Sequence, residues 1–312
     1  MTAVSIVEVG PRDGLQNEPR IAPTSAKVDL IARLVAAGAT RIEVASFVHP
    51  RLVPAMADAE DVMARVERNP AVRYIGLALN ERGARRAIDA GVDEVNFAIP
   101  TTEAFAMANQ NTTREHLLSE LELIGAATAD AGIALSVTIA VAFGCPFTGR
   151  VDPENVGAMA AAVQQRAEID ELAIADTIGC GVPSQVRQLF ALKEVRAARR
   201  LRAHFHETRH TAIANAFAAL DTGVEALDSS VGGLGGCPFA PGAAGNVATE
   251  DLVWALESAG VTTGIDAEAA TAAGRMICDV IGVGPRSGLA HAGVFPPLHP
   301  AAVPKQQVHP GC

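Results

Sequence analysis

The sequence predicts an α/β protein folded as a closed (β/α)8 TIM barrel, and three observations support this fold class. The chain has 312 residues, 49% of them hydrophobic, which is enough for one large core. Short runs rich in Val and Ile alternate with longer stretches of helical periodicity, as in a parallel sheet built from β-α units. Eight such units can be counted, whereas an open doubly wound sheet usually has fewer strands or a second domain.

The elements are expected to alternate along the chain. The predicted strands begin at apolar runs near residues 3, 41, 73, 93, 133, 171, 201 and 225. The helices begin near residues 24, 51, 81, 112, 153, 184, 209 and 249, with ends predicted to within roughly 2 to 4 residues. One junction recurs in the segments AAGATRIEV, DAGVDEVNF and DTGVEALDS, where helices end at Gly38, Gly91 and Gly223 before the second, fourth and eighth strands.

A further helix is expected after the eighth unit, over about residues 265–282. The barrel and this C-terminal extension would then occupy residues 1–292, and no linker divides them. From Gly293 onward, five prolines and several small residues oppose regular structure. Residues 293–312 are therefore predicted to form a loosely ordered tail, with the alternative that they cover the barrel mouth or a neighbouring subunit.

Composition and charge exclude several function classes. The net charge of −10 and the lack of a basic stripe argue against a nucleic-acid partner. No apolar stretch is long enough to span a bilayer, and residues 1–4 lack the features of a secretion signal, so a cytoplasmic location is expected. The cysteines are odd in number and lack CxxC spacing, which favours reduced thiols over a disulfide framework. They are Cys145, Cys180, Cys237, Cys278 and Cys312.

Two histidines, His204 and His206, are the first candidates for metal ligands. They lie at the end of a predicted strand, where alternation points both imidazoles to one side, at a separation that suits one ion. Paired histidines in strands also occur as ordinary core or surface residues. The interpretation as ligands depends on polar residues that follow other strands, because the loops at the carboxyl ends of barrel strands form the active face.

Charged residues lie within or after three of those other strands. The first is followed by a Gly- and Pro-containing turn in which Arg12 could stabilise an oxyanion and Asp13 could bind a metal; the alternative is a surface Arg-Asp turn. Glu43 in the second strand should point inward and needs a partner such as Arg12, or is only a member of a structural ion pair. Asp176 follows the sixth strand, where a helix cap or turn is the alternative.

The segment from Val231 to Asn246 is rich in glycine and is predicted to form a mobile lid. Cys237 would then be a thiol carried into the site, the alternative being an inert apolar cysteine. Asn246 offers an amide oxygen as a further ligand. Together with the carboxylate of Asp13 and the two imidazoles, this set favours Mg²⁺ or Mn²⁺, with Zn²⁺ less favoured.

These motifs, taken together, make the chain resemble the 3-hydroxy-3-methylglutaryl-CoA lyase family. The resemblance covers roughly residues 4 to 282 and rests on the segments VEVGPRDGLQNE, IEVASFVHP, GCPFTGRV, DTIGCGVP, HFHET and DSSVGGLGGCPFAPGAAGNVATEDLV. The RDG and HxH elements alone also fit related synthases and metal-dependent aldolases. The GLGGCP loop followed by GN and ATEDL is the lyase-like part, and it favours cleavage over condensation.

The resemblance implies a role for each candidate residue. Asp13, His204, His206 and Asn246 would bind the divalent cation. Arg12 would stabilise the enolate oxygen, and Cys237 would transfer a proton from the lid. Supporting roles would fall to Gln16, Glu43 and Asp176. The implied reaction is retro-Claisen cleavage of a 3-hydroxyacyl-CoA to acetyl-CoA and a keto acid, in leucine degradation or ketone-body formation, by a homo-oligomer.

Two departures from the family pattern concern the acyl pocket. The family's Arg-Gly-Tyr in the fifth strand is replaced by Ser136-Val137-Thr138, which removes a charge and a phenol. The family's His-Asp-Thr-Tyr-Gly-Gln becomes His-Glu-Thr-Arg-His-Thr at 206–211, so Arg209 or His210 could meet a different acyl carboxylate. We therefore expect an acyl group that can differ from methylglutaryl. The alternatives are a related aldol lyase or Claisen synthase that uses citramalyl-CoA or a 2-oxo acid, and a non-catalytic ligand-binding barrel.

Overall fold

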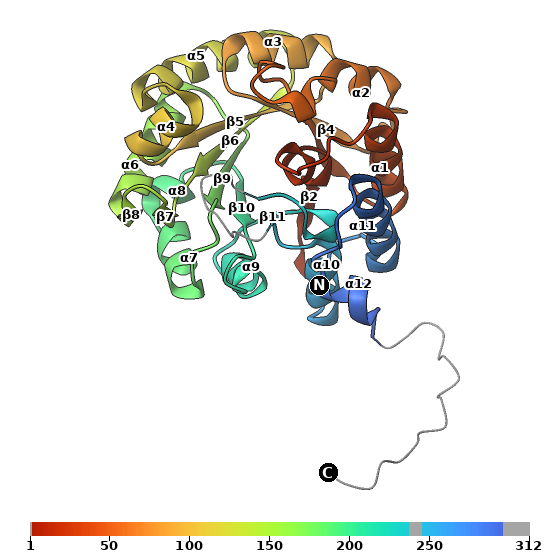
Figure 1. The fold of residues 1–312 in the computed structure, drawn as a ribbon. Helices are drawn as coiled ribbons and strands as arrows, with labels where there is room; N and C mark the ends of the chain where they lie inside the picture. Colours follow the sequence, from red (N-terminus) through yellow and green to blue (C-terminus); the bar gives the residue numbers. More distant parts are fainter. Residues whose placement is uncertain (1, 237–244, 296–312) are drawn as a thin grey trace, which may run out of the picture.

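Eight parallel strands close into a barrel in the computed structural model, which describes residues 2–236 and 245–295 (Figure 1). Hydrogen bonds join the strands in the order β10-β11-β2-β3-β4-β5-β6-β9. Their bounds are β2 (Ser5–Glu8), β3 (Arg41–Ser46), β4 (Arg73–Ala78), β5 (Glu94–Pro100), β6 (Ala134–Ala140), β9 (Glu171–Asp176), β10 (Leu201–Phe205) and β11 (Ala226–Ser229). The predicted fold class and the positions of its eight strands are confirmed.

Helices surround the strands on the outside, as Figure 1 shows. The helices that follow the eight strands are α1 (Thr24–Ala36), α2 (Ala59–Arg65), α3 (Glu81–Asp89), α5 (Arg114–Ala131), α6 (Pro153–Arg166), α7 (Pro183–Phe190), α9 (Ala212–Leu220) and α10 (Thr249–Ser258). The predicted extra helix is α11 (Ala267–Ile281), which packs on α1 and so joins the two ends of the barrel chain. Three further helices were not predicted: α4 (Glu103–Gln110), α8 (Lys193–Arg196) and α12 (Gly288–Ala292).

Two helices begin later than the sequence pattern predicts. The predicted start near residue 51 is replaced by a loop and a short 3₁₀ turn (Pro54–Met56), because Pro50 and Pro54 cannot continue an α-helix. The start predicted near 209 lies at Ala212, within the expected margin, after His210, whose backbone is left-handed with φ of 55°. The division into a domain at 1–292 and a tail stays a prediction, since residues 296–312 lie outside the described residues.

The inside of the barrel is more polar than its outer layer. The main hydrophobic core lies between the strands and the helices, while a separate small cluster inside the barrel consists of Val7, Val9, Ile75 and Ala226. Charged residues close the end where the strands begin: Arg41 pairs with Glu94 at 3.2 Å and with Glu171 at 2.8 Å. Ion pairs therefore replace part of the apolar interior that is usual in such barrels, and they lie below the mouth.

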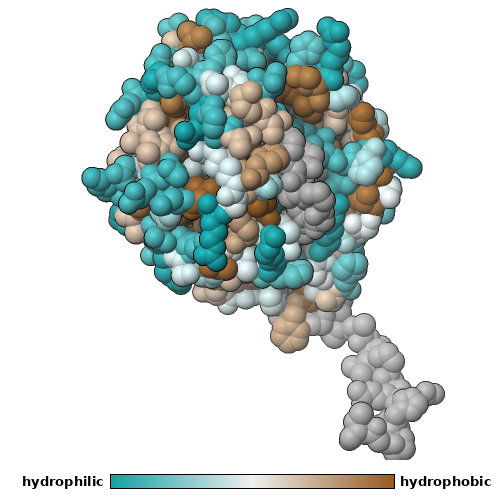
Figure 2. Space-filling view, turned by 60° about the vertical axis from the view of Figure 1, so that its left-hand side comes forward, coloured by the Kyte–Doolittle hydropathy of each residue, from teal (hydrophilic) through white to brown (hydrophobic). Residues whose placement is uncertain are grey.

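The outer surface carries its apolar side chains in separate patches. Figure 2 shows hydrophilic residues over much of the visible face with hydrophobic ones between them. The large hydrophobic side chains exposed in the described residues include Leu52, Phe147, Val182 and Trp254. Such scattered exposure is normal for a globular protein. No described helix combines the length and the hydropathy that a membrane crossing requires.

The predicted helix-to-strand glycines adopt the backbone that only glycine accepts readily. Gly38, Gly91 and Gly223 have φ values of 101°, 82° and 90°. Gly38 is also crowded, because a Cβ added there would collide with the backbone oxygen of Gly264. At this point Asp266 donates its backbone N–H to the oxygen of Ala37 at 2.9 Å, which ties α11 to the end of α1.

We expect Gly38→Ala to destabilise the protein more than Gly91→Ala does. Both changes force alanine into a left-handed backbone, which costs about 1–2 kcal/mol. Only Gly38→Ala adds a backbone collision, because no described atom lies within 4 Å of a Cβ built on Gly91. Urea unfolding of both variants measures the difference, and equal losses of unfolding free energy would contradict the close approach at Gly38.

Candidate active site

Four side chains that the sequence singles out as metal ligands meet at the mouth of the barrel. Asp13 lies in η1 (Gly10–Gly14), the short π-helix after β2; His204 lies in β10, and His206 directly follows that strand. One ligand atom from each of these three residues lies within 4.8 Å of the other two. Asn246 joins them from the segment before α10, and its side-chain N–H donates to Asp13 Oδ2 at 2.7 Å, across 233 positions of sequence.

The chemistry of these donors fits a divalent cation. Asn246 Oδ1 is buried and has no hydrogen-bond partner among the described residues. A buried amide oxygen without a partner is costly, and coordination of a cation would satisfy it. The imidazoles of His204 and His206 have ring centroids 5.1 Å apart, so both rings border the same space. A carboxylate, an amide oxygen and two imidazoles form a mixed oxygen and nitrogen set that suits Mg²⁺ or Mn²⁺ and also accepts Zn²⁺.

Arg12 connects this cluster to the interior of the barrel. Its guanidinium lies 2.7 Å from Asp13 Oδ1 and 2.8 Å from Glu43 Oε2. Burial by itself would raise the pKa of Asp13, but the charges of Arg12, His204 and His206 outweigh it and hold that pKa well below its usual range. Asp13 is therefore an ionised carboxylate throughout the physiological pH range. Arg12 Nε is buried and meets no acceptor in the described part of the chain, so one donor is left for another group.

The three supporting residues occupy different places. Glu43 points into the barrel as predicted, with Arg12 as its partner and Asn96 Nδ2 3.3 Å from its second oxygen. Asp176 accepts the backbone N–H groups of Cys180 and Gly181 at 2.9 and 2.8 Å, which is the turn-forming alternative weighed for it. Gln16 is half-buried, and its Oε1 has no partner within the described residues.

The residues predicted to contact the acyl group do not form one surface. Thr138 lies inside the barrel and donates to Asn96 Oδ1 at 3.0 Å. Arg209 is used locally, because its guanidinium donates to the backbone oxygens of Ile178 and Gly179 at 3.2 and 2.8 Å. The side chain of His210 is 90% exposed. Cys237 and most of the predicted lid, residues 237–244, lie outside the described residues.

Sequence reasoning missed several buried polar residues around the site. Arg202 and Asp228 lie inside the barrel next to the ligands, and Arg202 Nη2 is 3.5 Å from Thr138 Oγ1. A guanidinium is therefore present where the Ser136-Val137-Thr138 departure suggested that a charge is lost. The sequence could have predicted the inward position of Arg202. It stands two residues before His204, and alternation along a strand points both side chains to the same side.

Glu8 is a second residue that the sequence analysis left without a role. Its carboxyl group accepts the N–H of Gly10 at 2.7 Å and the N–H of Val231 at 3.2 Å, and its second oxygen is hydrogen-bonded to the hydroxyl of Thr249 at 2.6 Å. These contacts tie the loop after β2, which carries Asp13, to the segments that flank the predicted lid. Burial is the largest influence on the carboxyl and raises the pKa of Glu8 to about 8.

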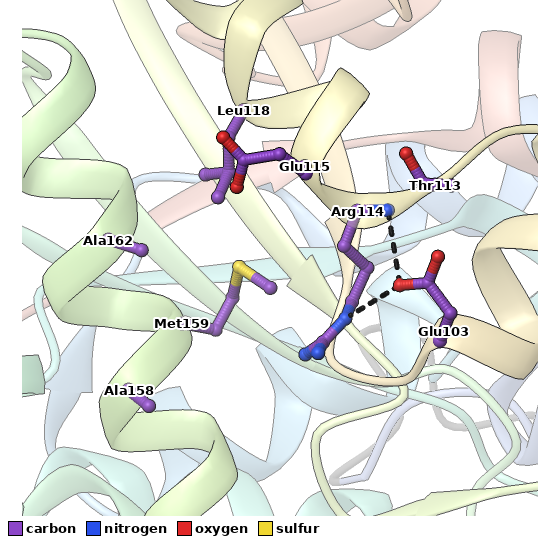
Figure 3. Close-up of a pocket in the computed structure, with 8 residues that line it drawn as sticks. All are labelled: Glu103, Thr113, Arg114, Glu115, Leu118, Ala158, Met159 and Ala162. Atoms are coloured by element: carbon purple, nitrogen blue, oxygen red, sulfur yellow. Dashed lines mark hydrogen bonds and ion pairs between the residues drawn. The ribbon is translucent and has the colours of Figure 1, made fainter.

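A hollow on the outer layer lies apart from this cluster. It has a volume of about 510 Å³ and lies between α5 and α6 beside the start of α4. Figure 3 shows Arg114 and Glu103 paired on one side, with Leu118 and Met159 facing the space. None of the proposed ligands lines it, so it is a groove between outer helices and not the mouth of the barrel.

Comparison with known proteins gives a consistent result. A family model described as HMGL-like matches residues 3–277. The chain is 42% identical to the hydroxymethylglutaryl-CoA lyase of Pseudomonas mevalonii, with 94% of this chain and 98% of that protein covered. It is 40% identical to the (R)-citramalyl-CoA lyase of Chloroflexus aurantiacus, with 97% and 98% covered. The match to the mitochondrial hydroxymethylglutaryl-CoA lyase of Arabidopsis thaliana, 42% identical, covers 89% of this chain but only 60% of that protein.

Solved structures agree with this result. The HMG-CoA lyase of Acinetobacter baumannii, in complex with coenzyme A and 3-methylmalate, superposes with a TM-score of 0.91 at 36% identity, covering 96% of this chain and 98% of that one. Fold and site thus define a (β/α)8-barrel carbon-carbon lyase with a carboxylate and imidazole cluster at the mouth. The chain belongs to the HMGL-like family, that of the hydroxymethylglutaryl-CoA lyases.

The raised pKa of Glu8 predicts a specific pH dependence of stability. Between pH 4.5 and about 8 the folded protein retains a proton on Glu8 that the unfolded chain releases. The free energy of unfolding therefore falls as pH rises through this range, by at most about 1.4 kcal/mol per pH unit for one proton. In urea titrations from pH 5 to 8, Glu8→Gln should show a shallower fall than the wild type.

The matched control for this experiment is Glu154→Gln, which changes an exposed glutamate at the start of α6. It should leave the slope of stability against pH unchanged. Parallel curves for the wild type and Glu8→Gln would show that Glu8 is ionised in the folded protein at neutral pH.

Proposed function

We propose that the protein is a divalent-metal-dependent lyase that cleaves a 3-hydroxy-3-methylglutaryl-CoA-like thioester to acetyl-CoA and a keto acid. The observation that carries this proposal is the meeting of Asp13, His204, His206 and Asn246 beside Arg12 at the barrel mouth. Relatives that bear the name of this activity cover nearly the whole chain. With 3-hydroxy-3-methylglutaryl-CoA as substrate the keto acid is acetoacetate, which would place the enzyme in leucine degradation or ketone-body formation.

The proposed cation site consists of Asp13, His204, His206 and Asn246, with Mg²⁺ or Mn²⁺ favoured over Zn²⁺ because half of the donors are hard oxygens. When bound there, a divalent cation would lower the pKa of the substrate's tertiary hydroxyl and polarise its oxygens. The fit rests on the buried and unpartnered Oδ1 of Asn246 in the described structure.

The remaining steps belong to the protein's own residues. A base at the mouth takes the proton of the hydroxyl, the resulting alkoxide becomes the carbonyl of the departing keto acid as the C2–C3 bond breaks, and the electron pair of that bond moves onto the thioester as an enolate. Arg12, held by Asp13 and Glu43, would face the enolate oxygen with its unused buried Nε as a donor within the described structure. Cys237, which lies outside the described residues, would supply the proton that completes acetyl-CoA. Gln16 and Asp176 would position these groups or the substrate.

A second candidate exists for the acyl group of the substrate. A relative named (R)-citramalyl-CoA lyase is 40% identical to this chain, and Ser136 and Thr138 depart from the family's Arg-Gly-Tyr. Arg209 and His210, in the loop between β10 and α9, would contact the acyl carboxylate of a substrate that reaches this loop. We therefore propose citramalyl-CoA as the alternative substrate of the same site.

Assembly and location follow the family analogy. We propose a homo-oligomer, a dimer or tetramer, and a cytoplasmic location. Cys145, Cys180 and Cys278 are free thiols in the described residues, which fits a reducing compartment.

The experiment that tests the function measures acetyl-CoA release from purified protein with Mg²⁺ or Mn²⁺. We expect release of acetyl-CoA from 3-hydroxy-3-methylglutaryl-CoA or from citramalyl-CoA. The thioester with the higher kcat/KM is the preferred substrate. A chelator should abolish the activity. Asn246→Ala should lower kcat/KM by about 10- to 100-fold or more, because a ligand is removed. Asn155→Ala, on the exposed side of α6, is the matched control and should retain full activity.

Cleavage of a free 2-oxo acid, without release of acetyl-CoA from either thioester, would reject this function in favour of an aldolase-type reaction. Binding of thioesters without turnover would instead favour the ligand-binding barrel.

A further inference from the structure

A continuous row of buried polar side chains runs around the inside of the barrel below the proposed cation site. We call it the interior belt, and its members are Glu43, Asn96, Arg202 and Asp228. One end reaches Arg12 through Glu43 at 2.8 Å, and the other reaches His204, whose Nδ1 is 3.1 Å from Asp228 Oδ2. Both ends of the belt therefore contact the candidate active site, although its middle lies on the opposite side of the barrel interior.

Arg202 is the cation of the interior belt. Its side chain is fully buried, and its place in β10 aligns it with Ala173 of β9, a small residue that leaves room for the guanidinium. Acids on both neighbouring strands flank it: Glu171 of β9 lies 3.2 Å from Nε, and Asp228 of β11 lies 3.4 Å from Nη1. Nη2 donates to Asn96 Oδ1 at 3.3 Å. The two contacts with acids are ion pairs without hydrogen-bond geometry, and Nη2 alone donates hydrogen bonds in the described structure. Charges on two strands and an amide on a third thus position one planar group.

Asp228 lies between Arg202 and the ligand His204. One of its oxygens is next to the guanidinium, and the other is next to His204 Nδ1. A carboxylate oxygen accepts hydrogen bonds, so the tautomer of a neutral His204 ring that fits this contact carries its proton on Nδ1. Nε2 is then the nitrogen with a free electron pair, which is the one that a cation requires.

We propose that Asp228 and Arg202 are positioning residues of the metal site. Asp228 orients the ring of His204 and selects the tautomer with Nε2 available, and Arg202 holds Asp228 in the orientation that does so. This inference rests on the proposed function only through its cation site, and it requires nothing of the substrate.

The test measures Mn²⁺ binding to the metal-free protein by the electron paramagnetic resonance signal of free Mn²⁺. Asp228→Asn and Arg202→Met should each weaken binding by about 10- to 100-fold. Arg202→Lys, which keeps the positive charge but loses the planar guanidinium, should give an intermediate loss of Mn²⁺ affinity. The control is Arg73→Met, which removes a guanidinium from the end of the barrel where the strands begin; Arg73 is partly exposed and pairs with Glu94 at 3.3 Å, outside the interior belt.

A second measurement separates orientation from general destabilisation. The ¹⁵N chemical shifts of His204 in the metal-free protein should report the proton on Nδ1 in the wild type and in Arg73→Met. In Asp228→Asn they should report a mixture of the two tautomers.

Mn²⁺ affinities within twofold of the wild type for both Asp228→Asn and Arg202→Met would overturn the proposal, as would an equal loss in Arg73→Met. If Arg202→Met does not fold, Asp228→Asn and Arg202→Lys decide the question by the same criteria. A wild-type protein that binds no Mn²⁺ would reject the cation site of the proposed function together with this inference. Wild-type binding with unaffected variants would reject this inference alone.

Discussion

Pairing of buried charge is the constraint on which the barrel interior depends. An ionised group removed from water is costly unless an opposite charge or several hydrogen bonds compensate it. Two arginines inside this barrel meet that requirement with carboxylates: Arg12 with Asp13 of its own loop and Glu43 of β3, and Arg41 of β3 with Glu94 and Glu171 from β5 and β9 across the barrel. The strands supply the acids at fixed positions, so the pairing requirement also fixes the side chains at the mouth.

The loops of the site are held by a different kind of contact. Glu8 binds backbone N–H groups on two loops that are more than 200 residues apart in sequence, because β2 and β11 are neighbours in the closed barrel. Closure of the barrel thus brings the loop of Asp13 next to the segments that lead into and out of the predicted lid. The same neighbour relation brings Asn246 to Asp13. The site therefore depends on the first and last strands meeting, and an open sheet would separate its two halves.

Periodicity was sufficient to predict the barrel, because each strand is a short apolar run that ends in polar residues. It was not sufficient for the start of α2, where a loop and a 3₁₀ turn at Pro54–Met56 occupy the predicted beginning of the helix. At the site, alternation in His204-Phe205-His206 and the order of the strands predicted which side chains would meet. The partner of His204 could not be predicted, since Asp228 stands in a neighbouring strand and strand register comes only from the folded sheet. Asp176 shows a second limit of the sequence analysis. An acid at a strand end can accept hydrogen bonds from its own loop, and the sequence does not distinguish such an acid from an active-site residue.

The pairing of opposite buried charges inside the barrel restricts which substitutions this sequence can accept. A single exchange of Arg202 or Asp228 leaves a buried charge without its counterpart, whereas two simultaneous exchanges can preserve neutrality. Substitutions at these positions should therefore occur in correlated sets across homologues, while the outer faces of the helices vary independently.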